Sequence, residues 1–248
     1  MKTFFYSFVL VLIIFLASCV SNEVANSDTV KQSEIYQSYS VSYDSGEKEL
    51  TATATFRFGG SSGTTLLLTK PADVTFDNEQ MPQEQNFFSG AFYQIFRQTN
   101  YKPFYSFVYG DCDKNKYANT ACIVPVEISK FPVTADKSKG IGVEWVLPLR
   151  NNENITLYVE DNAHNTCSDY TNIVGTTSLS IKPSALKNIV SGLVNIYLIR
   201  ESNSSLENAT HLGGNMYSKY TSKKIGITLT GTDLKEKKAN DSSIAKNN

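Results

Sequence analysis

The residues with the clearest catalytic potential form a Gly-x-Ser-x-Gly stretch at 59–63, with Ser61 at its centre. In hydrolases that use this pattern, the serine lies on a sharp turn between a strand and a helix, and a histidine activates it. The residues that follow here, 64–69, are threonines and leucines typical of a strand. The two histidines, His164 and His211, lie in the other half of the chain. We therefore predict a glycine-rich turn and no catalytic role for Ser61.

Two polar segments carry side chains that could bind a metal ion. Residues 111–115 place oxygen ligands at alternate positions, as the opening of an EF-hand calcium loop does. The sixth position of that loop needs glycine and holds Lys116, and the twelfth needs glutamate and holds Cys122. The second segment contains Glu160, Asp161, His164, Cys167 and Asp169. It offers one His and one Cys without a second pair nearby, so we expect two solvated loops, no metal site and no cofactor.

Aromatic residues are concentrated between Phe87 and Tyr109. On the strand expected at 104–109, Tyr105, Phe107 and Tyr109 share one face because side chains alternate along a strand. Such a face is either buried in the core or serves as a binding platform for sugar rings or a partner protein. The sequence leaves both alternatives open.

The N-terminus carries the features of an export signal. Residues 9–16 form an apolar run behind the basic residue Lys2, and the run is too short to span a bilayer stably. The next residues, Leu16-Ala-Ser-Cys19, resemble the lipobox of bacterial lipoproteins at all four positions. The resemblance implies that residues 1–18 are a signal peptide, that Cys19 carries a diacylglyceryl thioether, and that acyl chains such as palmitate anchor the protein to a membrane.

The same resemblance bears on location. Val20 stands where an aspartate often marks inner-membrane retention in related lipoproteins, which favours the outer membrane of a bacterial envelope. Residues 19–34 are polar and aperiodic, and we expect a flexible tether with a reach of roughly 50 Å. The formal net charge of −1 does not indicate the excess of basic residues that is typical of nucleic-acid-binding proteins, so we expect no nucleic-acid partner.

An exported protein folds where disulfides are permitted. Cys112 and Cys122 flank a polar loop between the runs expected at 104–109 and 120–128. If those runs pair as a hairpin, the two cysteines face each other across it, so we predict a Cys112–Cys122 disulfide. The alternatives are a bridge from one of them to Cys167, or three reduced thiols.

Alternation of apolar and polar residues predicts strands along most of the chain. It begins with a hairpin over 39–58. Further strand-like runs lie at 64–69, 73–77, 91–97, 104–109, 120–128, 141–147, 155–160, 176–181, 193–200 and 224–230. Short strands at this spacing, separated by Gly, Pro, Asn and Asp, are typical of antiparallel sandwiches.

We therefore predict an all-β chain with two β-sandwiches, over residues 35–129 and 130–232, and a disordered tail over 233–248. The second half resembles fibronectin type III and immunoglobulin-like sandwiches, because Trp145 lies on an early strand and Leu186 lies in a turn before a long strand. The resemblance implies two tandem immunoglobulin-like sandwiches. It implies nothing about activity.

The predicted function is a lipid-anchored, non-catalytic module that binds or scaffolds a protein or glycan partner in the cell envelope. The alternatives are a structural subunit of an envelope assembly and, on the strength of Ser61 or the His164 segment, a hydrolase or other enzyme.

Overall fold

The computed structural model describes residues 23–86 and 90–232, which form nineteen strands and three short 3-10 helices. The 3-10 helices are η1 (Ser27–Thr29), η2 (Gln32–Glu34) and η3 (Ala185–Asn188). The chain is therefore all-β, as predicted. None of the helical segments in these ranges is long and apolar enough to cross a membrane.

The first half forms two facing sheets. Its strands are β1 (Val24–Asn26), β2 (Ile35–Asp44), β3 (Glu49–Phe58), β4 (Thr64–Leu67), β5 (Asp73–Phe76), β6 (Glu79–Gln80), β7 (Gln83–Asn86), β8 (Gly90–Gln98), β9 (Phe104–Gly110) and β10 (Lys116–Cys122). One sheet has the order β10–β9–β5–β6. In the other, β3 pairs with β2 on one side and with β4 and β8 on the other.

The second half has the arrangement of an immunoglobulin-like sandwich. Its strands are β11 (Ile128–Lys130), β12 (Thr134–Asp136), β13 (Ile141–Trp145), β14 (Glu153–Asp161), β15 (Thr166–Thr171), β16 (Ser178–Ile181), β17 (Gly192–Ser205), β18 (Gly214–Thr221) and β19 (Ile225–Thr230). One sheet is β11–β13–β16, and the facing sheet contains β15, β14, β17, β19 and β12. As predicted, Leu186 lies in a turn before the long strand β17, and its side chain is fully buried there.

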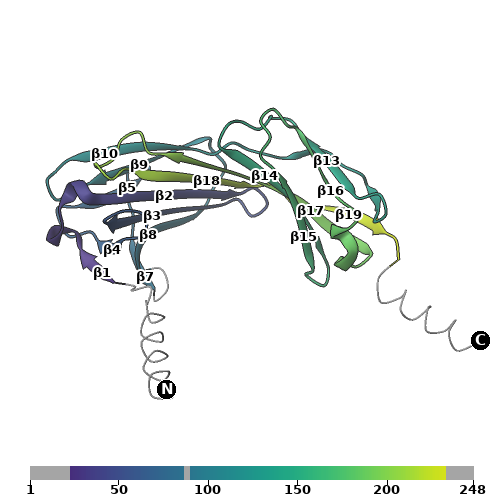
Figure 1. The fold of residues 1–248 in the computed structure, drawn as a ribbon, viewed down its shortest axis with the longest axis horizontal. Coiled ribbons are helices and arrows are strands. Elements are labelled where there is room, and N and C mark those ends of the chain that lie inside the picture. The colour runs from purple at the N-terminus through teal and green to yellow at the C-terminus, as the bar shows by residue number, and fades with distance from the viewer. Residues whose placement is uncertain (1–22, 87–89, 233–248) are drawn as a thin grey trace, which may run out of the picture.

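One strand departs from the predicted division of the chain. β18 pairs in parallel with β2, from Gly214 opposite Gln37 to Thr221 opposite Asp44. The long strand β17 pairs with β14 and β19 in the second half, and its C-terminal end pairs with β18. Residues 214–221 therefore extend a sheet of the first half, and one sheet runs through the whole molecule (Figure 1). For the other segments, the boundary near residue 130 remains a prediction.

The predicted tether is wrong for residues 23–34. Val24–Asn26 forms the strand β1, which pairs in parallel with β4. Ser27 and Gln32 are buried, and Gln32 Nε2 donates to the Ser27 carbonyl at 2.6 Å. Residues 23–34 thus belong to the folded first half, which extends far closer to Cys19 than the sequence suggests. Residues 1–22, including Cys19, and the predicted tail over 233–248 lie outside the described residues.

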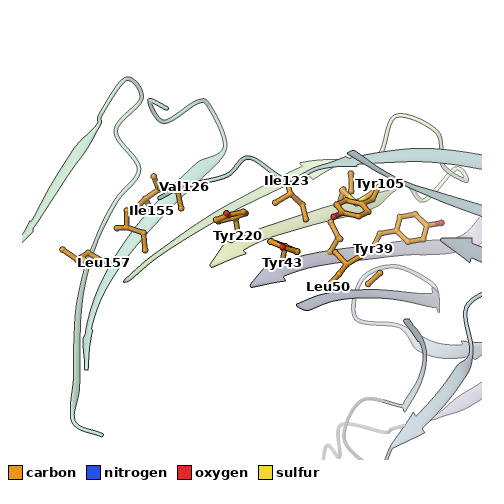
Figure 2. Close-up of a cluster of buried hydrophobic side chains, with 14 of the residues drawn as sticks. Tyr39, Tyr43, Leu50, Tyr105, Ile123, Val126, Ile155, Leu157 and Tyr220 are labelled. Carbon is orange, nitrogen blue, oxygen red and sulfur yellow. The ribbon is translucent and has the colours of Figure 1, made fainter. Parts of the chain in front are cut away.

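The strands form because their apolar residues alternate toward one core. In β2 every second side chain is buried, beginning at Ile35. Tyr39 stacks on Phe107 with ring centroids 4.7 Å apart, and Phe56 lies 4.4 Å from Tyr109. The core continues through Tyr105, Ile123, Tyr220 and Val126 to Ile155 and Leu157 in the second half (Figure 2).

This core corrects the binding-platform interpretation. Tyr105, Phe107 and Tyr109 are at most 1% exposed, so no ligand could stack on them. Tyr105 also stacks on Phe76 at 5.5 Å between centroids. The face they share points at the opposite sheet, and their role is packing.

The junction between the halves contains polar contacts as well. The Glu127 carboxylate accepts hydrogen bonds from Ser45 Oγ at 2.6 Å and from the Tyr220 hydroxyl at 2.7 Å. Nearby, the buried side chains of Arg200 and Glu153 form an ion pair. A buried pair of this kind needs close-fitting partners on both sides, so it fixes the local geometry.

Candidate binding groove

A groove of about 940 Å³ covers the solvent side of the sheet β11–β13–β16. Its floor consists of small exposed residues, Gly142 on β13 and Ser178 and Ser180 on β16. A Cβ atom added at Gly142 would meet only Ser180 Cβ, at 3.8 Å. Glycine and serine at these three outward positions leave space for the groove, and Glu144, the other outward position of β13, also lines it.

Large apolar side chains line the walls of the groove. Phe131 lies on the segment after β11, and Tyr170 lies near the end of β15. Tyr170 is 67% exposed, and Ile173 beside it is 68% exposed. Exposed apolar side chains gathered around a concavity are typical of binding surfaces.

The apolar wall continues onto two neighbouring loops, residues 146–149 and 173–177. Backbone hydrogen bonds join them, with the Gly175 N–H donating to the Leu149 carbonyl at 2.9 Å and the Leu149 N–H donating to the Thr176 carbonyl at 3.1 Å. The loops carry Val146, Leu147, Ile173 and Val174, all of them exposed. The exposed surface around the groove is therefore aliphatic as well as aromatic.

The charges of the groove are balanced. Its lining contains Lys130, Lys139, Lys182, Asp136, Glu144 and Asp169. Lys130 Nζ pairs with Glu144 Oε1 at 2.7 Å. The Ser138 N–H donates to the Asp136 carboxylate at 2.8 Å and lowers the pKa of that group. With both signs interspersed, the groove exerts no strong field on a charged ligand.

The Gly-x-Ser-x-Gly stretch is a turn between β3 and β4, as predicted. Gly59 and Gly60 have φ angles of 86° and 114°, a region that favours glycine. A Cβ atom on Gly63 would lie 1.8 Å from the Phe58 carbonyl oxygen. The backbone conformation thus requires glycine at all three positions. In addition, a strand follows Ser61, where a hydrolase has a helix.

The two predicted polar loops have the same turn structure. Asp111 in one loop and Asp161 in the other accept hydrogen bonds from the backbone N–H and the side-chain amide of an asparagine four residues on. These are Asn115 and Asn165. The third residue after each aspartate, Lys114 and His164, has a positive φ. Because the carboxylates hold the turns, they are not arranged to hold a metal ion.

Asp161 has two additional donors, the Ala163 N–H at 2.8 Å and the Val190 N–H at 2.7 Å. Burial opposes ionisation of Asp161, but the donors outweigh it and lower the pKa. Glu160 forms ion pairs with Lys224 at 2.7 Å and His164 at 3.1 Å, and these contacts lower its pKa as well. Within the described ranges, no group of three or more His, Cys, Asp and Glu side chains is placed to bind a metal.

The predicted Cys112–Cys122 disulfide is wrong, because the hairpin has a different register. Cys122 lies opposite Phe104, and Lys116 lies opposite Gly110 at the other end of the ladder. Cys112 follows Gly110, so the two cysteines are separated by the length of β10, about 20 Å at 3.3 Å per residue. A disulfide needs Cα atoms within about 7 Å. Cys112, Cys122 and Cys167 are free thiols.

The groove residues were not predicted as a site. Phe131 lies far from Tyr170 and Ile173 in the sequence, and nothing in the sequence connects these two segments. The signal available was their position at strand ends, where an apolar side chain has no place in the alternating core pattern.

No protein-family model matches the chain, and no curated protein matches it. Among solved structures, it is similar to the FN1–FN3 domains of chicken CNTN1, with 8% identity, a TM-score of 0.23, and coverage of 74% of this chain and 64% of that one. It is also similar to SGBP-B of a Bacteroides ovatus mixed-linkage glucan utilization locus in complex with a mixed-linkage heptasaccharide. The identity is 8%, the TM-score is 0.24, and the match covers 75% of this chain and 55% of that one. A third similar structure is that of a 1.5-MDa bacterial ice-binding adhesin. The identity is 10%, the TM-score is 0.23, and the match covers 82% of this chain and 67% of that one. The chain spans less than two-thirds of the first two structures, and with TM-scores this low we take no functional argument from any of the three.

Proposed function

We propose that the protein is a lipid-anchored, non-catalytic module of the bacterial envelope that binds or scaffolds a protein or glycan partner through the groove of the second sandwich. The groove itself supports this proposal best. It combines a volume of about 940 Å³, small residues on its floor and exposed apolar walls. This combination is typical of recognition sites.

Anchoring through acyl chains on Cys19 is the second part of the proposal. The lipobox supports it, and Glu23, the first residue that the structure describes, lies only four residues after Cys19. Four residues span at most about 14 Å. The acyl chains would therefore hold the first sandwich against the membrane, and the location we favour is the outer membrane.

Metabolic labelling with a fatty-acid analogue tests the anchor. The wild-type chain should incorporate the label and fractionate with membranes. A Cys19→Ala variant should lose both properties and accumulate as the precursor. Label retained in this variant would contradict lipidation at Cys19.

Photo-cross-linking in intact cells tests the groove. A benzophenone amino acid in place of Tyr170 should form a specific adduct with an envelope protein or glycan. Gly142→Phe should abolish the adduct, because the new ring would fill the groove. Gly226→Phe is the matched control, since Gly226 is an exposed strand glycine outside the groove lining. An adduct that persists equally in both variants would show that the partner does not use the groove.

A further inference from the structure

We propose that the first residues of the predicted tail dock on the second sandwich, where the Asp233 carboxylate forms an ion pair with Lys137 in a basic pocket. This pocket adjoins the binding groove, and Asp136 lines both. The inference goes beyond the proposed function. It concerns a contact within the chain, which closes one end of the groove whether or not the groove binds a partner.

The pocket lies where the chain leaves its last strand, and it has a volume of about 490 Å³. Its lining comes from the turn after β12, from residues around η3, and from Gly231 and Thr232 directly after β19. Because Thr232 itself lines the pocket, the residues that follow it start at the pocket. Tethering of this kind gives them a high effective concentration there, so a ligand from solution would have to displace them.

The pocket and its border with the groove carry four lysines, namely Lys137, Lys139, Lys182 and Lys187. The two turns that carry them are packed together, because a Cβ atom on Gly140 would lie 2.3 Å from the Ile181 carbonyl oxygen. Asp136 is the one acidic group among the described lining residues, and its carboxylate accepts the Ser138 N–H at 2.8 Å. The chain continues as Asp233-Leu-Lys-Glu236 and so brings a net negative charge to this basic site. The charges of the segment and of the site are therefore complementary.

Lys137 is the residue that determines the pairing. It is only 9% exposed, and its Cβ, Cγ and Cδ atoms lie 3.2–3.5 Å from the position that a Cβ atom on Gly231 would occupy. The aliphatic part of the lysine side chain therefore covers the chain two residues before Asp233. Two residues span at most about 7 Å, which places the Asp233 carboxylate within reach of the ammonium group. A lysine this deeply buried is stable only with an acceptor for its charge.

Hydrogen bonds on both sides fix the chain just before Asp233. Ser191 Oγ, beside the start of β17, donates to the Gly231 carbonyl at 2.7 Å. The Lys137 N–H donates to the Thr230 carbonyl at 3.0 Å and continues the parallel pairing of β12 with β19. A side chain that follows a fixed segment loses less conformational entropy on pairing than one on a free chain. Asp233 is therefore the favoured partner of Lys137, ahead of acidic residues further along the tail.

Thermal unfolding of the full chain in neutral detergent, followed by the fluorescence of Trp145, tests the ion pair. Asp233→Asn should lower Tm by about 3–12 °C, which corresponds to one hydrogen bond between charged groups in a chain of this size. Asp241→Asn is the matched control, because it removes a carboxylate further along the same tail, and its Tm should equal that of the wild type. In a Lys137→Met background, Asp233→Asn should have no further effect. Equal Tm values for Asp233→Asn and Asp241→Asn would overturn the proposal.

Acetylation of lysines in the folded protein, measured by mass spectrometry, gives a readout that does not require Lys137→Met to fold. In the wild type, Lys137 should react more slowly than Lys187, which is exposed. Lys137 should react several times faster in Asp233→Asn than in Asp241→Asn, because the first variant lacks the carboxylate that holds the ammonium group. Lys187 should react equally in both variants. Identical rates for Lys137 in the two variants would contradict the ion pair.

Inorganic sulfate distinguishes the tail from an anion in solution. Sulfate stabilises folded proteins in general, so its effect is compared between the wild type and Asp233→Asn at matched ionic strength. If Asp233 fills the site, sulfate should raise Tm more in Asp233→Asn than in the wild type, because only the variant leaves the site open to an external anion. An equal or larger rise in the wild type would show that Asp233 does not occupy the pocket.

Discussion

Replacing Asp161 by alanine should destabilise the second sandwich. The carboxylate accepts four hydrogen bonds, from the N–H groups of Ala163, Asn165 and Val190 and from the Asn165 amide. The donors on Ala163 and Asn165 belong to exposed residues of the turn, and water can replace the carboxylate there. The bond from Val190 is different, because it ties the β14–β15 hairpin to the segment after η3.

A hydrogen bond to a charged group contributes about 1.5–3 kcal/mol, and the turn bonds contribute less after solvent exchange. We therefore expect Asp161→Ala to lower the free energy of unfolding by about 2–4 kcal/mol. At about 2–4 °C per kcal/mol for a chain of this size, Tm should fall by about 5–15 °C. Trp145 is the only tryptophan and is buried in the second sandwich, so its fluorescence reports this half directly.

Asp111→Ala is the matched control. It removes the turn bonds from Asn115 and a long bond from the Tyr117 hydroxyl at 3.4 Å, but no backbone bond from a separate segment such as that of Val190. It should therefore shift the Trp145 transition less. The native pKa of Asp161 is below its ordinary value of 3.8, so the stabilisation is complete above about pH 4 and is lost as the pH falls through the native pKa. A Tm for Asp161→Ala within about 2 °C of the wild type at pH 7 would refute this reasoning.

Three further outcomes follow from the core and the thiols. Tyr105→Ala should lower the free energy of unfolding, measured by chemical denaturation, by about 3–5 kcal/mol. Phe104→Ala, at an exposed neighbouring position, should lower it by less than about 1 kcal/mol. Equal losses in the two variants would contradict the buried and exposed faces assigned to β9. Arg200→Met should lower the free energy of unfolding by about 3–5 kcal/mol, because it leaves the Glu153 carboxylate buried without its ion-pair partner. Adding Glu153→Met should restore most of this stability. A double variant no more stable than Arg200→Met alone would contradict this explanation. Burial raises the pKa of Cys167 to about 11, so at pH 8 this thiol should react with iodoacetamide far more slowly in the folded than in the unfolded protein. After unfolding, Cys112, Cys122 and Cys167 should all react. A protein mass that shows a disulfide would contradict the assignment of three free thiols.

The sequence predicted the elements that local patterning determines. β2 and β3 were evident because Tyr39, Val41 and Ala52 alternate with serines and threonines, and this pattern needs no knowledge of the partner strand. The turn at 59–63 was evident because its glycines are required by the backbone. By contrast, the pairing of β18 with β2 has no local signal, since any strand with a matching apolar face could occupy that position.

The other errors have a common physical origin in distant contacts. Residues 23–34 look like a tether because they are polar, yet Ser27 Oγ accepts from the Thr69 N–H at 2.8 Å and Gln32 accepts from the Cys112 N–H at 3.1 Å. The disulfide error came from placing a strand at 120–128, whereas β10 ends at Cys122. The groove was missed because its residues come from several segments that only the folded sandwich brings together.

The pairing of β18 with β2 sets an order of events during biogenesis. The chain is synthesised from its N-terminus, so β2 and β3 are made long before β18. Until β18 is present, one edge of β2 has no neighbouring strand, and Gln37 lacks its partner residue Gly214. Such an unpaired edge on a slow-folding sheet is exposed to misassociation. The first sandwich should therefore need protection until the chain is complete, and truncation anywhere before residue 214 should leave both halves incomplete.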